Sequence, residues 1–236
     1  MTVTGQLELV AFDAPDIQRV ASFYAELAGW KTVREVPEWI TLRAADGQEV
    51  AFQLAPDHVA PHWPGQESPQ QFHLDLQVDG IEEWALRAVG LGATRLGGGE
   101  SWVTLTDPAG HPFDLCQKDG AQGVELFAVT IDTGDPAGLA RFYAGLLGME
   151  VTYDGSEGSM IAGGGKSVMF QRVEGYTRPQ WPDPAHPQQA HLDINVADLD
   201  TGQARAVELG ATRLKQGAAN YRVFTDPDGH PFCLTL

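Results

Sequence analysis

The sequence predicts an α+β fold built from two tandem domains, residues 1–119 and 124–236. One phrase occurs twice, as TDPAGHPFDL from Thr106 and as TDPDGHPFCL from Thr225. A single repeat pair of this length indicates two domains rather than a solenoid, whose units are about 20–50 residues long. Further pairs extend the duplication along the chain: Phe23-Tyr24 with Phe142-Tyr143, and His73-Leu74-Asp75 with His191-Leu192-Asp193.

Each half begins with a strand followed by an amphipathic helix. In the first half, Asp16 is the expected N-cap and Gly29 the expected C-terminal stop. The second half repeats the pattern with Asp135 as the cap, Pro136 at the first helical position and Gly148 as the stop. The apolar positions at helical spacing are Ile17, Val20, Ala21, Tyr24, Leu27 and Ala28, and then Leu139, Ala140, Tyr143, Leu146 and Leu147.

The rest of each half reads as strands, a proline-rich loop and a second strand–helix–strand module. In the first half, the stretch APDHVAPHWPGQESPQQ cannot pair as a central strand and is expected to be a loop. The strands expected around it are KTVREV, WITLRA, EVAFQL, FHLDLQV, WVTLTD and PFDLC, with a helix that ends at Gly90–Gly92.

Composition and charge narrow the range of functions. The chain has 236 residues, 43% of them hydrophobic, and a net charge of −17. Such a surface repels nucleic acid and anionic lipid. No apolar run reaches the roughly 20 residues that span a membrane, and the N-terminus does not resemble an export signal. With two cysteines and no Cys-x-x-Cys spacing, we expect a cytoplasmic protein.

Three pairs of motifs resemble the vicinal oxygen chelate superfamily, which includes glyoxalases, bleomycin-resistance proteins and extradiol dioxygenases. The pairs are DIQRVASFYAELAGW with DPAGLARFYAGLLGM, QQFHLDLQV with QQAHLDINV, and DPAGHPFDL with DPDGHPFCL. The resemblance implies that each domain consists of two βαβββ modules whose mixed sheet forms a cup. Because one fold serves many chemistries, it does not identify the reaction.

The resemblance also marks where a metal ligand is expected. Metal-using members take a His or Gln from the first strand, a His from the fifth and a Glu from the last. The corresponding residues are Leu9, His73 and Asp114 in the first half, and Ala128, His191 and Cys233 in the second. Since Leu and Ala cannot bind a metal, we expect the usual metal site to be lost.

Other polar residues could replace the missing ligand. Strand alternation places Asp13 on the face of Leu9, Asp132 on that of Ala128, and Asp75 and Asp193 beside the two histidines. Iron, zinc, manganese or nickel could then be held, with His73 and Asp114 as its most direct ligands. Asp13 lies about 13 Å along the strand from the ligand position, which weighs against this alternative.

Several of these residues have structural interpretations as well. His73 and His191 could contact a ligand or bond within the strands. Asp75 and Asp193 could form ion pairs with the duplicated Arg95 and Arg213, and Asp13 and Asp132 could organise the turns before the helices. His111 and His230 follow Asp-Pro-x-Gly and are expected to support that turn.

Asp114 is the main catalytic candidate, together with His73. Burial in an apolar cup would raise the pKa of Asp114 and suit it to proton transfer. Cys233 is interpreted as a small buried residue rather than a nucleophile. The loop residues Trp63 and Trp181 could stack on a planar ligand or pack against their own domains.

Three functions follow as hypotheses. The first is a metal-free protein that binds a small organic molecule, similar to the bleomycin-resistance branch. The second is a metal-dependent lyase, isomerase or dioxygenase, and the third is a metal-free acid/base enzyme that uses Asp114. A monomeric pseudo-dimer and a homodimer are both compatible with the sequence.

Overall fold

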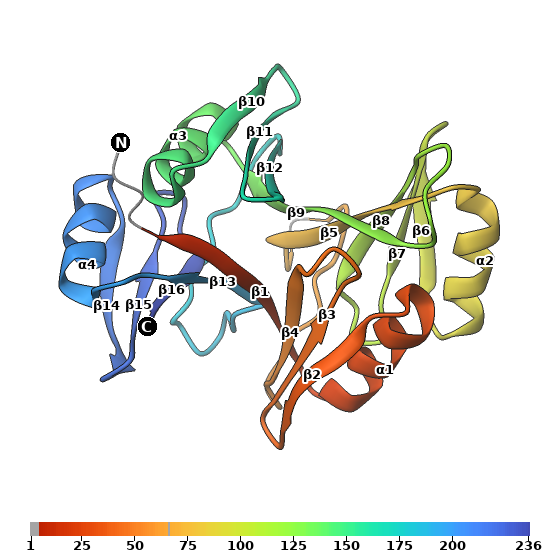
Figure 1. Cartoon of the computed structure of the whole chain (residues 1–236), viewed down its shortest axis with the longest axis horizontal. Helices are drawn as coiled ribbons and strands as arrows, with labels where there is room; N and C mark the ends of the chain where they lie inside the picture. Colours follow the sequence, from red (N-terminus) through yellow and green to blue (C-terminus); the bar gives the residue numbers. More distant parts are fainter. Residues whose placement is uncertain (1–4, 66) are drawn as a thin grey trace. The chain divides into compact units, whose positions relative to one another are not determined.

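The computed structural model describes residues 5–65 and 67–236, which form four successive strand–helix–three-strand modules (Figure 1). The first half contains β1 (Gln6–Ala14), α1 (Ile17–Ala28), β2 (Lys31–Val36), β3 (Trp39–Arg43), β4 (Glu49–Leu54), β5 (Phe72–Val78), α2 (Ile81–Gly90), β6 (Thr94–Gly98), β7 (Trp102–Thr106) and β8 (Pro112–Gln117). The second half contains β9 (Glu125–Thr133), α3 (Pro136–Leu147), β10 (Glu150–Asp154), β11 (Gly158–Gly163), β12 (Lys166–Arg172), β13 (Ala190–Asn195), α4 (Leu199–Glu208), β14 (Thr212–Ala218), β15 (Tyr221–Thr225) and β16 (Pro231–Thr235).

The strands form two mixed eight-stranded sheets, which confirms the predicted α+β class. Their orders are β14-β15-β16-β13-β1-β4-β3-β2 and β10-β11-β12-β9-β5-β8-β7-β6. The pairs β5–β8 and β13–β16 are parallel, whereas the hairpin neighbours are antiparallel. Each sheet therefore combines four strands from one half of the sequence with four from the other.

Two compact units do not coincide with the sequence halves. We call Ala11–Val129 the central unit, and residues 5–10 together with Thr130–Leu236 the terminal unit. The boundaries fall inside β1 and β9, so each of these strands contributes residues to both units.

The first helix of each half is capped as expected. Asp16 Oδ1 accepts a bond from the Arg19 amide at 3.0 Å, and Asp135 Oδ1 accepts one from the Gly138 amide at 3.1 Å. Gly29 and Gly148 end α1 and α3 with φ of 69° and 67°, in the left-handed region that only glycine adopts at little cost.

A buried tyrosine on each of these helices joins the helix to the Asp-Pro-x-Gly turn. In the central unit, α1 packs on β3 and β4, and the Tyr24 ring stacks between Trp30 and Phe52 with centroids 5.5 Å from each. Its hydroxyl donates to Asp107 Oδ2 at 3.4 Å. In the terminal unit, the Tyr143 hydroxyl donates to Asp226 Oδ2 at 3.1 Å.

The proline-rich segments of both halves are irregular, as expected, and they lead into β5 and β13. The sequence interpretation missed β6, whose end is rich in glycine. At Gly98 (φ 152°) a Cβ atom would lie 2.5 Å from the Trp102 carbonyl oxygen, so the close approach of β7 requires glycine there. Within the described residues, no helix is long and apolar enough to cross a membrane.

Candidate functional site

In the central unit, three predicted site residues lie together: His73, Asp75 and Asp114. His73 and Asp75 are alternate residues of β5 and point to the same face of the sheet. Asp75 is paired with Asp114 in the parallel register of β5 and β8. One potential ligand atom from each of the three lies within 4.8 Å of the others. We call these residues the His73 cluster.

Gln70 is hydrogen-bonded to the imidazole ring of His73. The side-chain amide nitrogen of Gln70 lies 2.9 Å from Nδ1 of the buried imidazole. Because an amide N–H can only donate, Nδ1 accepts this bond, and the neutral ring carries its proton on Nε2. Nε2 lies 3.9 Å from Asp75 Oδ1, so that N–H is on the side of the ring nearer the carboxylates.

Burial raises the pKa of Asp114 above its usual value. Loss of solvation is the main cause, and the Asp75 carboxylate adds to it, whereas His73 and a hydrogen bond from Thr104 oppose it. The direction agrees with the expectation for a carboxyl group in an enclosed site. A carboxyl group shifted in this way is suited to exchange a proton with a bound molecule.

The terminal unit repeats the arrangement with one change. His191 and Asp193 on β13 and Cys233 on β16 place their ligand atoms within 4.8 Å of one another, and we call them the His191 cluster. Gln188 donates to His191 Nδ1 at 3.0 Å, and His191 Nε2 lies 3.5 Å from Asp193 Oδ1. Burial and the nearby Asp193 raise the pKa of the Cys233 thiol, which keeps it protonated. The sequence interpretation took Cys233 as a buried residue, whereas the structure has it half-buried.

Asp13 and Asp132 are both buried near the ends of β1 and β9. The Asp13 backbone carbonyl accepts a bond from His111 Nε2 at 2.9 Å. Asp132 Oδ1 accepts one from Gln171 Nε2 at 3.4 Å. The Asp13 bond uses the backbone and not the carboxylate, so the roles of the two carboxylates stay predictions.

The two turn histidines support the Asp-Pro-x-Gly turns, as expected. His111 Nδ1 lies 3.0 Å from Asp107 Oδ2, and His230 Nδ1 lies 3.0 Å from Asp226 Oδ2. The same carboxylates accept the backbone amides of the turns.

The ion pairs considered for Asp75 and Asp193 do not form with the duplicated arginines. Arg95 makes a bidentate pair with Glu82, at 2.7 and 2.8 Å. The Arg213 guanidinium donates to backbone carbonyls of Gln216 and Val223 instead. That structural interpretation of the two aspartates is therefore wrong.

Trp63 and Trp181 are half-buried in the proline-rich loops. Each precedes a cis proline, Pro64 and Pro182 respectively. Their part in binding stays a prediction.

The sequence interpretation missed Gln70 and Gln188, the residues that fix the two histidine tautomers. A signal was present, because both lie three residues before their histidine within QQFHLD and QQAHLD. Thr104 was missed as well, and only the pairing of β7 with β8 opposite Asp114 reveals it.

The donor atoms of the His73 cluster fit a divalent ion only in part. One imidazole nitrogen and two carboxylates suit iron, manganese or zinc. However, Nε2 carries a proton while Gln70 donates to Nδ1, and a metal ligand needs that lone pair. The residues at the superfamily's first-strand position, Leu9 and Ala128, are buried and aliphatic, so they supply no further donor.

Comparison with known proteins agrees with this fold. A family model described as a glyoxalase-like domain matches residues 9–116 and again 128–235. Glyoxalase I from Zea mays superposes with a TM-score of 0.68 at 19% identity, covering 98% of this chain and 92% of that one. A putative dioxygenase from Bacillus subtilis gives 0.62 at 12% identity, covering 100% and 86%. No curated protein sequence matches the chain significantly.

The chain therefore belongs to the glyoxalase-like domain family and carries that domain twice. The identities to the solved structures are low, so these structures establish the fold and leave the reaction open.

Proposed function

We propose that the protein binds a small organic molecule at the His73 cluster without the metal ion that many members of the superfamily use. The observation that carries the proposal is the Gln70–His73 hydrogen bond, which places the imidazole proton on Nε2. Within the cluster, Nε2–H offers a donor, and Asp75 and Asp114 offer acceptors.

These groups favour a ligand that carries both a hydrogen-bond acceptor and a donor such as a hydroxyl or amine. Asp114 would then hold a proton for the ligand or remove one from it, because burial raises its pKa. Binding without turnover and acid/base catalysis use the same contacts. They differ only in whether the bound molecule reacts.

A metal-dependent enzyme is the second candidate, favoured by the spacing of the three ligand atoms. It requires the Gln70 amide to rotate so that its oxygen accepts a proton from Nδ1, which would free the Nε2 lone pair. In that arrangement His73, Asp75 and Asp114 would hold the ion, which would supply Lewis-acid or redox chemistry.

Substitution of Gln70 separates the two candidates. In Gln70→Glu the new carboxylate accepts a proton from Nδ1, so the Nε2 lone pair faces the cluster. We expect the wild type, purified without chelator, to contain no stoichiometric iron, zinc, manganese or nickel. We expect Gln70→Glu to bind added Zn²⁺ about tenfold more tightly than the wild type.

Gln188→Glu is the matched control, because it makes the same change at the His191 cluster and leaves the His73 cluster intact. Stoichiometric metal in the wild type, lost in His73→Ala, would overturn the metal-free proposal. If metal is absent, a thermal-shift screen of hydroxy acids and amino alcohols tests binding, and Asp114→Asn distinguishes turnover from binding alone.

A further inference from the structure

The start of each proline-rich loop is attached to the Asp-Pro-x-Gly turn of its own unit. In the central unit we call residues 55–65 of this loop the strap. On the strap, His58 Nε2 lies 3.2 Å from the Ala109 carbonyl oxygen of the turn. A Cβ atom on Gly110 would lie 2.7 Å from Cβ of Ala60, so the strap lies directly against the turn.

In the terminal unit a tyrosine makes the same attachment. The same offset in the sequence relates His73 to His191 and His58 to Tyr176. The Tyr176 hydroxyl donates to the Asp228 carbonyl at 3.1 Å. Because a phenol stays uncharged from acid to neutral pH, this attachment does not change with pH in that range.

One nitrogen of the half-buried His58 ring has no hydrogen-bond partner. A carbonyl can only accept, so Nε2 carries the proton of the neutral ring and Nδ1 holds the lone pair. Nδ1 is buried, and the part of the chain that the structure describes offers it no hydrogen bond. A proton added at Nδ1 would therefore place an unsatisfied donor and a charge at a buried position, which disfavours the attached strap.

The neighbouring His111 ring carries a positive charge. Its Nδ1 lies 3.0 Å from Asp107 Oδ2, and its Nε2 lies 2.9 Å from the Asp13 carbonyl oxygen. Since both partners are acceptors, both nitrogens carry protons. Burial opposes this charge, but Asp107 raises the pKa of His111 above its usual value. The His58 and His111 ring centroids are 4.8 Å apart, so a second charged ring would be repelled.

The charged groups around His58 come from the strap, the turn and β1. Burial is the main influence on His58, followed by His111, and together they lower its pKa to about 4. Asp57 on the strap and Asp107 in the turn oppose this shift, and Asp13 on β1 acts through the charge of His111. On a detached strap, His58 would have its usual pKa of about 6.5. The attachment is therefore complete above about pH 6.5 and is lost as the pH falls toward 4.

We infer that the strap is an acid-sensitive element, which leaves the turn when His58 takes up a proton at Nδ1. The terminal unit keeps its attachment over the same range, because Tyr176 makes it there. Gln70, which is hydrogen-bonded to His73, follows the strap in the same proline-rich loop. Acid thus acts on the loop that leads into the His73 cluster, and this response does not require a ligand at that cluster.

Amide hydrogen exchange of the ¹⁵N-labelled full chain at pH 7 and pH 5 tests the response. The reporter is the Ala55 amide at the start of the strap, which donates to the Ala14 carbonyl at 2.9 Å. Its counterpart is the Val173 amide, which donates to the Thr133 carbonyl at 3.0 Å. After correction for the intrinsic effect of pH, the protection of Ala55 should fall about fivefold more than that of Val173, a figure reduced for solvent screening. Equal changes at the two amides would overturn the inference.

Three substitutions identify the group that responds. His58→Phe keeps an aromatic ring that cannot take up a proton, so the difference between Ala55 and Val173 should disappear. His62→Phe removes the other histidine of the strap, which is exposed and lies 3.3 Å from Glu67, and should leave the difference intact. Tyr176→Phe is the matched change in the terminal unit and should not make Val173 sensitive to pH. A difference that persists in His58→Phe, or that disappears in His62→Phe, contradicts the inference.

The wild-type chain also gives a direct measurement if His58→Phe fails to fold. The ring chemical shifts of His58, followed from pH 7 to pH 4, should change together with the protection of Ala55. A His58 ring that titrates while Ala55 stays equally protected would overturn the inference. His73→Ala should leave the response unchanged, so failure of the proposed function at the His73 cluster would be seen separately.

Discussion

Asp114 and Cys233 occupy the same position in the duplicated strand β8 or β16, and their difference is the main chemical asymmetry between the two clusters. Asp114 places a second carboxylate beside Asp75, whereas Cys233 places a protonated thiol beside Asp193. Only the His73 cluster therefore offers two carboxylates that can share or exchange a proton.

Replacing Asp114 should separate stability from function. Because its folded-state pKa is raised, the ionised carboxylate at pH 7 destabilises the fold, and this cost disappears as the pH falls through that pKa. We expect Asp114→Asn to raise the free energy of unfolding at pH 7 by up to about 1 kcal/mol. Ligand binding at the cluster should weaken in the same variant.

The matched change at the other cluster is Cys233→Asp, which creates the paired carboxylates there. Its denaturation midpoint at pH 7 should fall, and the loss should shrink toward pH 4. Urea denaturation at pH 7 and at about pH 4 measures the midpoints of Asp114→Asn and Cys233→Asp. An Asp114→Asn midpoint below that of the wild type would contradict this account.

His58 gives a second prediction at the residue scale. Its Nε2–H donates to the Ala109 carbonyl at 3.2 Å, and its Nδ1 is buried without a hydrogen-bond partner in the described chain. Burial, with a contribution from nearby His111, lowers the pKa of His58 to about 4 although Asp57 and Asp107 oppose the shift. The stability due to the neutral ring is thus complete above about pH 6.5 and is lost as the pH falls toward 4.

The variant His58→Phe removes this titration and keeps an aromatic ring, as Tyr176 does at the equivalent position. Between pH 7 and pH 5 the wild type should lose about 1 kcal/mol more than the variant, a figure reduced for solvent screening at the partly exposed ring. Urea denaturation at the two pH values measures the difference. Parallel pH profiles would show that His58 does not titrate in this range.

At the scale of elements, the sequence predicted the helices and most strands because their signals are local. Asp16 caps the start of α1 and Gly29 ends the helix, each through a hydrogen bond to a residue of the same helix. The alternation of side chains along a strand placed His73 and Asp75 on one face of β5. By contrast, β6 was missed because its glycines are required by the approach of β7, which no local pattern encodes.

Removing the tyrosine hydroxyl from the first helix of each half measures how much its hydrogen bond to the Asp-Pro-x-Gly turn contributes to stability. Tyr24→Phe and Tyr143→Phe each remove a hydroxyl bond to a buried carboxylate, and each should cost about 1 kcal/mol. The loss should be larger for Tyr143, since its bond to Asp226 is 3.1 Å long and that of Tyr24 to Asp107 is 3.4 Å. Urea denaturation compares Tyr24→Phe and Tyr143→Phe with the wild type. Midpoints equal to that of the wild type would show that neither hydrogen bond contributes to stability.

At the scale of the whole molecule, the compact units depend on residues outside their own sequence half. The terminal unit includes the first part of β1: the Gly5 amide donates to the Leu146 carbonyl at 3.2 Å, and Thr235 donates to Glu8 at 3.2 Å. The domain bounds predicted from the sequence, 1–119 and 124–236, describe the two sequence repeats and stay a prediction.

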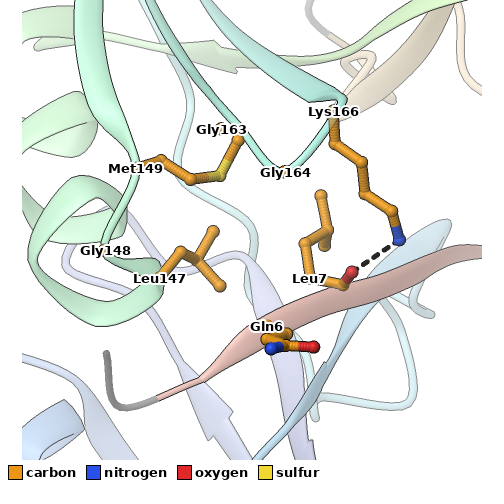
Figure 2. A pocket seen from close by; sticks show the side chains of 8 residues that line it. All are labelled: Gln6, Leu7, Leu147, Gly148, Met149, Gly163, Gly164 and Lys166. Carbon is orange, nitrogen blue, oxygen red and sulfur yellow. Dashed lines mark hydrogen bonds between the residues drawn. The ribbon is translucent and has the colours of Figure 1, made fainter. Parts of the chain in front are cut away.

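A fragment spanning residues 124–236 should therefore be much less stable than the same fragment with residues 5–10 joined to its N-terminus by a flexible Gly-Ser linker. The extension restores the bond from the Gly5 amide to the Leu146 carbonyl, and the backbone carbonyls of Leu7 and Glu8 that accept from the Lys166 ammonium. Figure 2 shows the bond between Lys166 and Leu7, which both line a pocket of the terminal unit. Denaturant midpoints and near-UV circular dichroism measure the difference. Identical midpoints would show that β1 is dispensable for this unit.

The sequence by itself determined the duplication, the α+β class, the capped helices and the histidine–aspartate pairs, because each depends on contacts between near neighbours or on a repeated pattern. The tertiary structure decided which strands share a sheet and that Asp114 joins His73 and Asp75. These features depend on strand pairing and packing between distant segments, for which local sequence carries no signal.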